Sequence, residues 1–337
     1  MNKIYLSGNY VIVERDGNVY EYPRTLSVYT LEGGNYVIKE RIDDGQLVIP
    51  ISQIGTYFDE AGAVAYDEAS LVAFLRENTG FKTAGGGSPA DPDAELFITN
   101  ASITDSTQKI AINQLVVDLK DYGIWSKMKA IYPFVGGTAT THKWNLKDPQ
   151  DTDAAFRLVF NGGWTHSVNG VQPNGVNVYA DTFLTPSTAL SLNSSHLSYY
   201  SRTNSNGTEV EIGVNTSNNY NLLEIRTSGT TYFLINQNGL TSASDSDSRG
   251  FYVGNRQASN DIDGWRQGVK VINGTTVSTI LPTRKIFIGA NNNNGTYALP
   301  STKECAFASI GDGLTDTEAT DFYTAVQSFN TSLSRQV

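Results

Sequence analysis

The chain has 337 residues, enough for about two or three domains; 39% of them are hydrophobic and 17% are charged. The uncharged polar remainder, with 31 glycines, and the 18 tyrosines favour short strands joined by many turns. The formal net charge of -10 argues against a nucleic-acid groove, no apolar run is long enough to span a bilayer, and the single cysteine, Cys305, excludes an intrachain disulfide framework.

The first 55 residues show alternating apolar residues broken by turn signals. Asp16-Gly17-Asn18 has the composition of a tight hairpin turn, and Gly33-Gly34-Asn35 and Asp43-Asp44-Gly45 repeat the pattern. We therefore expect four to six strands, which include Tyr10–Glu14, Val19–Tyr22, Leu26–Leu31, Tyr36–Glu40 and Leu47–Ile51. So small a module gains stability from a partner surface or from oligomerisation. The start of the chain turns polar at Ser7, without the sustained apolar core of a secretory signal.

The pattern then changes to a helical period over residues 67–78, with Asp67 as the N-cap and Gly80 beyond the end. This helix either faces the core of the small module or contacts another subunit. A segment rich in Gly, Ser and Pro follows, from Ala84 to Pro92, and is typical of a linker. We expect an anchoring or oligomerisation module over residues 1–82, a linker over 83–93 and a second domain over 94–337.

The second domain opens with a helix, capped by Thr104 or Ser106 and ending at Gly123, and closes with another that Thr315 or Asp316 caps and that runs to about Phe329. Between them, short apolar segments alternate with loops rich in Asn, Gly and Ser, which predicts a β-sandwich or jelly roll. The expected strands are Ala155–Phe160, Leu190–Tyr200, Glu209–Val214, Leu222–Thr227, Thr231–Ile235, Gly250–Val253, Val269–Ile272 and Lys285–Gly289.

Two stretches resemble laminin-G-like, concanavalin A-like domains. The run from Ile310 to Tyr323 resembles their closing strand and the segment that follows it, and Gly264-Trp265-Arg266-Gln267-Gly268 resembles one of their hairpins. Phe287-Ile288-Gly289-Ala290 lies between the two. The resemblance implies a mainly β fold, in which a small N-terminal β module with a short helix precedes a concanavalin A-like jelly-roll sandwich with flanking helices.

A second resemblance covers most of the chain. Residues 122–137, 142–149 and 302–308 resemble structural proteins of tailed phages that infect Bacteroidales, including crAss-like phages, and residues 59–81 resemble a module that precedes variable tips in the same phages. This implies a virion fibre protein of the head or the tail, with the head favoured because the chain is short. Such a fibre is a homotrimer or homodimer, anchored to capsid or tail proteins by its N-terminus, made in the bacterial cytoplasm and released by lysis.

The function that this resemblance implies is adhesion of a lectin-like tip to glycans of the host or the environment. Two alternatives remain open: a capsule-depolymerising glycoside hydrolase tip, and purely structural decoration of the capsid without a ligand. We expect no enzymatic activity, no cofactor, no metal, no nucleic-acid partner and no membrane insertion.

The hydrolase alternative depends on Glu209-Val210-Glu211, since a retaining glycosidase needs two facing carboxylates. Strand alternation places both on one face, and an exposed strand face explains the pattern equally well. His142, His166 and His196 lack the spacing of a zinc site, and Cys305 lies in an apolar run typical of an inert core thiol. The acidic loops 148–153 and 245–247 offer oxygen ligands for calcium, although neither matches a full loop signature.

Sugar rings stack on aromatic side chains and exchange hydrogen bonds with planar amides, so aromatic and amide residues near loops are the candidates for glycan contact. The same aromatic residues also suit a sandwich core. The predicted ligand-binding residues are Trp164, Trp265, Tyr199, Arg202 and Asn219; the amide run Asn291–Asn294 has the same character.

Overall fold

The computed structural model describes the backbone of six strands between residues 3 and 50, and all of residues 91–337. The chain divides into two units between Ala90 and Asp91. Within the described ranges, none of the helices combines the length and the apolarity that crossing a bilayer requires.

The N-terminal strands form two antiparallel three-stranded sheets, β1-β2-β3 and β4-β5-β6. In the first, Arg15 pairs with Asn18 across the predicted Asp16-Gly17 turn, and in the second Glu32 pairs with Asn35. The predicted strands are confirmed; the expected helix over 67–78 lies outside the described residues. The bounds are β1 Lys3–Ser7, β2 Tyr10–Arg15, β3 Asn18–Pro23, β4 Ser27–Glu32, β5 Asn35–Glu40 and β6 Gln46–Pro50.

The second unit begins with two helices that depart from the sequence prediction. Asp91, Pro92 and Asp93 were assigned to the linker, but α2 (Pro92–Asn100) starts here. Asp91 caps it by accepting from Asp93 N–H, and proline is well suited to the first helical position because its missing N–H has no helical partner there. Helix α3 (Ser106–Asp121) is capped by Asp105 rather than by Thr104 or Ser106.

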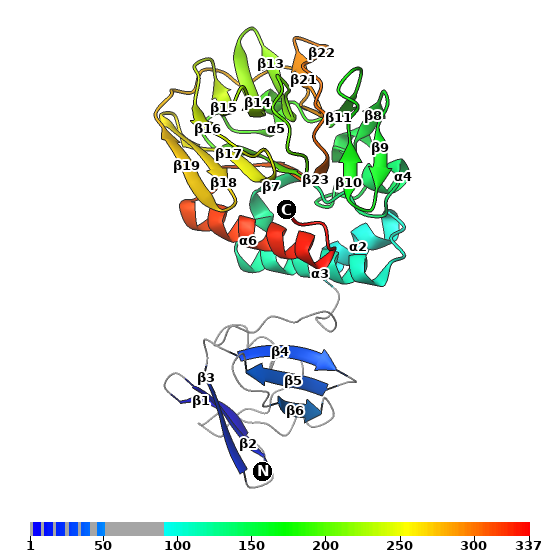
Figure 1. Ribbon diagram of the computed structural model, residues 1–337, viewed down its shortest axis with the longest axis vertical. Helices are drawn as coiled ribbons and strands as arrows, with labels where there is room; N and C mark the ends of the chain where they lie inside the picture. The colour runs from blue at the N-terminus through cyan, green and yellow to red at the C-terminus, as the bar shows by residue number, and fades with distance from the viewer. Residues whose placement is uncertain are drawn as a thin grey trace. The chain divides into compact units, whose positions relative to one another are not determined.

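Two sheets, almost entirely antiparallel, form the body of this unit (Figure 1). The eight-stranded sheet has the order β19-β18-β17-β12-β23-β10-β9, with β7 also paired to β23. Its strands are β7 Met128–Tyr132, β9 Thr165–Ser167, β10 Gly170–Gln172, β12 Ser195–Ser201, β17 Gly250–Ala258, β18 Asp261–Arg266, β19 Val269–Gly274 and β23 Cys305–Gly311.

The nine-stranded sheet has the order β16-β15-β14-β13-β20-β11-β8, and β21 branches from β13 as a parallel neighbour that also pairs with β22. Its strands are β8 Val159–Asn161, β11 Tyr179–Asp181, β13 Ile212–Thr216, β14 Asn219–Thr227, β15 Thr230–Gln237, β16 Ser242–Ser244, β20 Phe287–Ile288, β21 Asn291–Asn293 and β22 Thr296–Ala298.

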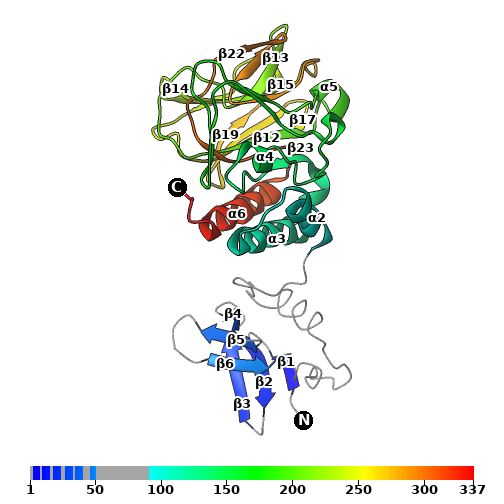
Figure 2. The ribbon, with the colours of Figure 1, turned by 90° about the vertical axis from the view of Figure 1, so that its right-hand side faces the viewer.

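One face of the eight-stranded sheet packs against the nine-stranded sheet, and its other face is covered by α3 and by α6 (Asp316–Ser332) (Figures 1 and 2). The core between the sheets contains Leu197, Ile212 and Phe233, all fully buried. The helix side has its own core, in which the rings of Phe251, Phe307 and Phe322 meet edge to face. The predicted mainly β fold, a sandwich of two antiparallel sheets with flanking helices, is confirmed.

Several predicted boundaries move. Residues 153–155 form a 3-10 turn, and Phe156 at its end has a φ of 58°, so the expected strand over 155–160 shortens to β8. Helix α6 is capped by Thr315, one of the two predicted caps, which forms a reciprocal capping box with Glu318, and it continues to Ser332 rather than Phe329. The remaining short elements are η2 Trp125–Lys127, α4 Ala139–His142, η3 Asp153–Ala155 and α5 Pro186–Ala189.

Candidate functional site

Three aromatic rings from separate strands form a stack on the outer side of the nine-stranded sheet. Ala180 of β11 and Ile288 of β20 are paired and contribute to the core between the sheets. Because successive side chains of a strand point to opposite faces, the neighbouring Tyr179 and Phe287 point away from that core. Tyr297 comes from β22, at the end of the domain farthest from α3 and α6 (Figures 1 and 2). We call these three residues the aromatic platform.

The rings of the platform are nearly parallel and differ in exposure. The ring centroids of Tyr179 and Phe287 are 4.4 Å apart with planes at 22°, and those of Tyr179 and Tyr297 are 5.7 Å apart at 17°. Phe287 is 6% exposed and Tyr297 is 39% exposed. Since Tyr179 covers one face of Tyr297, the exposed surface of Tyr297 consists largely of its other face and its edge. The platform therefore presents a fixed aromatic surface to solvent.

The β21–β22 hairpin that carries Tyr297 is held by side-chain amides. Its tip is a two-residue turn in which Asn294 and Gly295 have φ values of 54° and 104°, the conformation in which Asn-Gly is favoured. Asn292 Oδ1 accepts from Gly295 N–H, and Asn292 Nδ2 donates to the carbonyl of Lys285, each at 2.8 Å. Ser217 N–H also donates to Asn294 Oδ1 at 3.0 Å. These bonds fix the hairpin relative to β13, β14 and the segment before β20.

Two basic residues lie beside the platform. Lys285 pairs with Asp181, with Nζ 3.1 Å from Oδ2, and its ammonium lies 3.9 Å from the centroid of the Phe183 ring. Arg284 is exposed, and its Nε is 3.9 Å from where a Cβ on Gly295 would lie. None of the platform residues was predicted from the sequence to bind a ligand; the available signal was the Asn294-Gly295 turn at the end of the amide run Asn291–Asn294.

The predicted ligand-binding residues do not lie together. Tyr199 is fully buried in the core between the sheets and donates its hydroxyl hydrogen to the carbonyl of Lys303, so it has no exposed ring face. Trp265 is 5% exposed and belongs to the helix-side core, where it lines a shallow pocket of about 310 Å³ beside α6. Trp164 is half-buried; its Nε1–H donates to the carbonyl of Asn161.

The other two predicted residues are engaged within the fold. Arg202 donates through Nε to the carbonyl of Arg335 and pairs with Glu304. Asn219 donates to the carbonyls of Thr216 and Ser217 and accepts from the Thr279 hydroxyl. Asn219 thus closes the turn between β13 and β14, and Arg202 joins the segment after β12 to Glu304 and to the C-terminal segment.

Glu209 and Glu211 lie on the same side of the chain, as predicted, but immediately before β13, and they face a buried lysine. Lys303 Nζ is 3.2 Å from Glu209 Oε2 and 3.1 Å from Glu211 Oε1, and Glu211 and Lys303 have no exposed surface. Burial raises the pKa of Glu211 to about 7, although the positive charge of Lys303 acts in the opposite direction and lowers it. Burial acts in the same direction on Glu209, but the Thr302 N–H and Lys303 outweigh it and hold its pKa below the ordinary value. A carboxylate that attacks a glycosidic bond has to reach it, and Glu211 is enclosed.

Two of the three histidines are adjacent, although 24 residues separate them. His142 Nε2 accepts from Gly137 N–H, so the neutral His142 ring carries its hydrogen on Nδ1 and donates it to His166 Nδ1 at 3.0 Å. Burial lowers the pKa of both rings, that of His142 to about 3. His196 is enclosed separately: its Nδ1–H donates to the carbonyl of Asp312 and its Nε2 accepts from Ser309, and burial lowers its pKa to about 4.

We expect the stability of the sandwich domain to fall as the pH drops below about 6.5. The histidines of the unfolded chain become protonated near that pH. In the folded domain, His196 and His142 stay neutral until the pH falls to about 4 and about 3. Each such histidine therefore removes up to about 1.4 kcal/mol of unfolding free energy per pH unit over this range. Urea unfolding followed by circular dichroism measures the slope. The His142→Gln side chain keeps a hydrogen-bond acceptor and a donor but does not titrate, so this variant should have a smaller slope of unfolding free energy against pH. An unchanged slope would contradict the assignment of the pH dependence to His142.

The acidic loops are occupied by protein cations. Asp151 contacts Lys143 and Arg157, and Asp153 contacts Arg157. Asp247 forms hydrogen bonds with Arg249, which hold its pKa at about 2. Within the described part of the chain, no three or more His, Cys, Asp or Glu side chains converge as a metal site would require.

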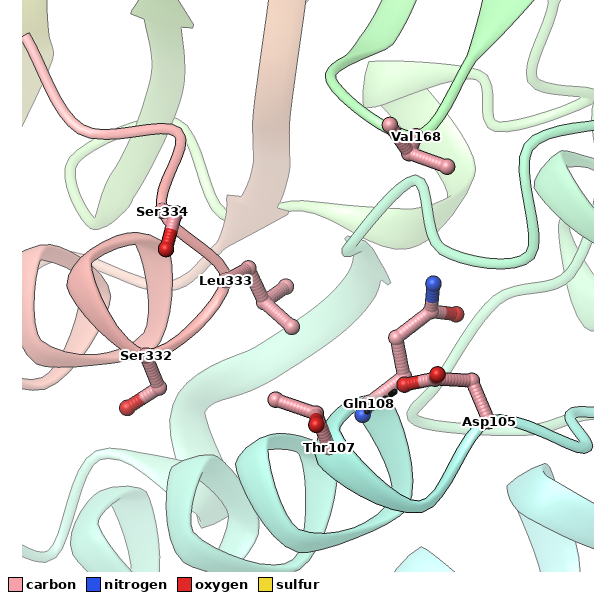
Figure 3. Close-up of a pocket in the computed structure, with 7 residues that line it drawn as sticks. All are labelled: Asp105, Thr107, Gln108, Val168, Ser332, Leu333 and Ser334. Carbon is pink, nitrogen blue, oxygen red and sulfur yellow. Dashed lines mark hydrogen bonds between the residues drawn. The ribbon is translucent and has the colours of Figure 1, made fainter.

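Figure 3 shows a shallow pocket of about 190 Å³ on the helix side of the domain. It lies between the start of α3, the turn at Val168 and the end of α6. Three of its polar side chains already serve the fold: Asp105 caps α3, Gln108 Oε1 accepts from Gly136 N–H, and Ser332 Oγ donates to the carbonyl of Ser328.

No protein-family model matches the chain, and no curated protein matches it. Among solved structures, it is similar to a mutant of Trypanosoma rangeli sialidase displaying trans-sialidase activity (8% identity, 95% of this chain and 48% of that chain, TM-score 0.46). It is also similar to the K499G mutant of NanB sialidase from Streptococcus pneumoniae (20% identity, 47% of this chain and 27% of that chain, TM-score 0.36). A third similarity is to the CBM40 of Ruminococcus gnavus IT-sialidase bound to alpha2,3 sialyllactose (16% identity, 39% of this chain and 82% of that chain, TM-score 0.30).

Proposed function

We propose that this chain is a non-enzymatic fibre-type virion protein, most specifically a head fibre, whose sandwich domain attaches to glycans through the aromatic platform. The observation that carries the glycan-binding part is the fixed ring of Tyr297, 39% exposed and stacked on Tyr179. The virion part rests on the sequence resemblance to phage structural proteins.

A stacked aromatic ring suits a sugar for two physical reasons. The apolar C–H face of a sugar ring buries area against an aromatic face, and the stack has already immobilised Tyr297, so little side-chain entropy is lost on binding. The exposed Asn293 lies in the same hairpin, and its Nδ2, which makes no hydrogen bond to a described residue, can donate to a sugar hydroxyl group. A few polar groups beside an apolar surface are what small-ligand sites generally contain.

We expect Tyr297→Ala to lower the affinity of the full chain for its glycan by about tenfold or more, because the exposed ring face is lost. A glycan array identifies the ligand, and calorimetric titration measures the affinity. Tyr297→Phe keeps the ring and should bind like the native chain. Leu240→Ala removes a side chain that is 70% exposed in another loop and serves as the control. Native affinity in Tyr297→Ala would refute the platform as the site, and an array without signal would favour capsid decoration.

The fibre proposal also includes anchoring through residues 1–82 and self-association as a trimer or dimer. A small β module buries little apolar surface alone, and symmetric association is the common way to cover the rest. Sedimentation of the full chain and immunogold labelling of intact virions test both points. A monomer at high concentration would remove the oligomer, and particles without label would remove the virion role.

A further inference from the structure

Arg284 differs from the other described arginines. Within residues 91–337 it makes no hydrogen bond, ion pair or ring contact, and it is exposed. The others are engaged: Arg157, Arg202, Arg249 and Arg266 with carboxylates, Arg226 with the Asn204 amide, and Arg256 and Arg335 with backbone carbonyls. A guanidinium is planar and carries five donors, which match a carboxylate or sulfate in a bidentate geometry.

The position of Arg284 relates it to the platform. A Cβ on Gly295 would lie 3.9 Å from Arg284 Nε, so Arg284 borders the tip of the hairpin on the side toward which that Cβ would project. Tyr297 pairs with Asn292 across the hairpin, and directly opposite residues of an antiparallel pair share a side. Asn292 fixes the arrangement, because its amide joins the carbonyl of Lys285 to Gly295 N–H.

The charges around the platform favour an anionic group at Arg284. The chain carries a formal net charge of -10, which repels anions in general. Beside the platform, Lys285 is paired with Asp181, whereas Arg284 has no carboxylate partner within residues 91–337. The edge of the hairpin thus combines an exposed aromatic face with one uncompensated guanidinium.

We propose that this edge selects acidic saccharides, with the sugar ring on Tyr297 and its carboxylate or sulfate ester on Arg284. This inference rests on the proposed glycan-binding function and adds the class of ligand. Neutral saccharides use the ring alone and bind more weakly. Raising the salt concentration weakens binding of the acidic ligand more than that of its neutral counterpart.

The test is an array of uronic acid, sialylated and sulfated oligosaccharides, each with its neutral counterpart, probed with the full chain and followed by titration of the best pair. We expect the acidic member to bind about tenfold tighter or more. Arg284→Gln should abolish that preference and leave neutral binding unchanged, whereas Tyr297→Ala should weaken both. Lys109→Gln makes the same charge change at an exposed lysine of α3 and controls for net charge. The carboxylated and sulfated arms identify the anionic group.

Equal affinity of Arg284→Gln and the native chain for the acidic saccharide, or an equal loss in Lys109→Gln, would overturn this inference and leave the glycan-binding function intact. The same holds if neutral saccharides bind as tightly as acidic ones. Absence of binding to every saccharide would instead contradict the glycan-binding function itself.

Discussion

Replacing Arg335 with methionine is expected to lower the free energy of unfolding of the sandwich domain by about 3 kcal/mol or more, because it leaves several buried carbonyls without donors. Arg335 has no exposed surface and follows the last helix. Its guanidinium donates to the carbonyls of Pro133, Phe134 and Ala306 at 2.6–2.8 Å and to Asn330 Oδ1 at 2.8 Å. Burial lowers its pKa to about 9, so it remains charged at neutral pH.

These bonds join the end of α6 to two distant segments, the loop after β7 and the start of β23. Phe134 has a φ of 45°, a strained conformation for a bulky residue, and its carbonyl accepts from Arg335. Chemical denaturation of the Arg335→Met variant measures the loss. Arg284→Met serves as the control, because it removes an exposed arginine that makes no hydrogen bond or ion pair with a described residue, and it should unfold like the native chain. Equal stability of the two variants would show that the carbonyl contacts of Arg335 contribute little.

The contrast between Arg335 and the β-hairpins shows what the sequence determines. Alternation, turn composition and capping residues are local, so they predicted the pairing on either side of Asp16-Gly17 and a helix start at Thr315 or Asp316. In the sequence, Arg335 lies between Ser334 and Gln336 and looks like part of a polar tail. Asn330 is five positions away, but the carbonyls that Arg335 binds are about 30 and 200 positions away. No local pattern records contacts of that range.

The candidate site follows the same rule. Tyr179, Phe287 and Tyr297 are separated by more than a hundred residues between the first and the last, and each belongs to a strand of two or three residues. Such short strands leave no readable period. The tryptophans and Tyr199 were instead singled out by residue type and nearness to predicted loops, and neither criterion distinguishes a ring that faces the core from one that faces solvent. The topology of the two sheets makes that distinction.

Glu209 and Glu211 were correctly predicted to share a side, but the sequence offered no sign of Lys303, which lies more than 90 positions away. Replacing Lys303 with methionine is expected to destabilise the domain by about 3–5 kcal/mol, since it leaves two buried carboxylates without their cation. Because burial already raises the pKa of Glu211 to about 7, the folded domain favours the protonated acid. Stability from this group is present below about pH 4.5 and is lost as the pH rises through about 7.

The cost of Lys303→Met should therefore grow with pH, and adding Glu211→Gln should recover part of it, because that change removes the charge that the lysine compensated. Denaturation of the single and double variants at about pH 5 and about pH 8 separates this electrostatic loss from lost packing. Packing alone would give a deficit that is independent of pH and unaffected by Glu211→Gln. The rescue by Glu211→Gln is the decisive measurement. Neutralising Glu211 raises the stability of the Lys303→Met variant only if the buried charge of Glu211 opposes folding.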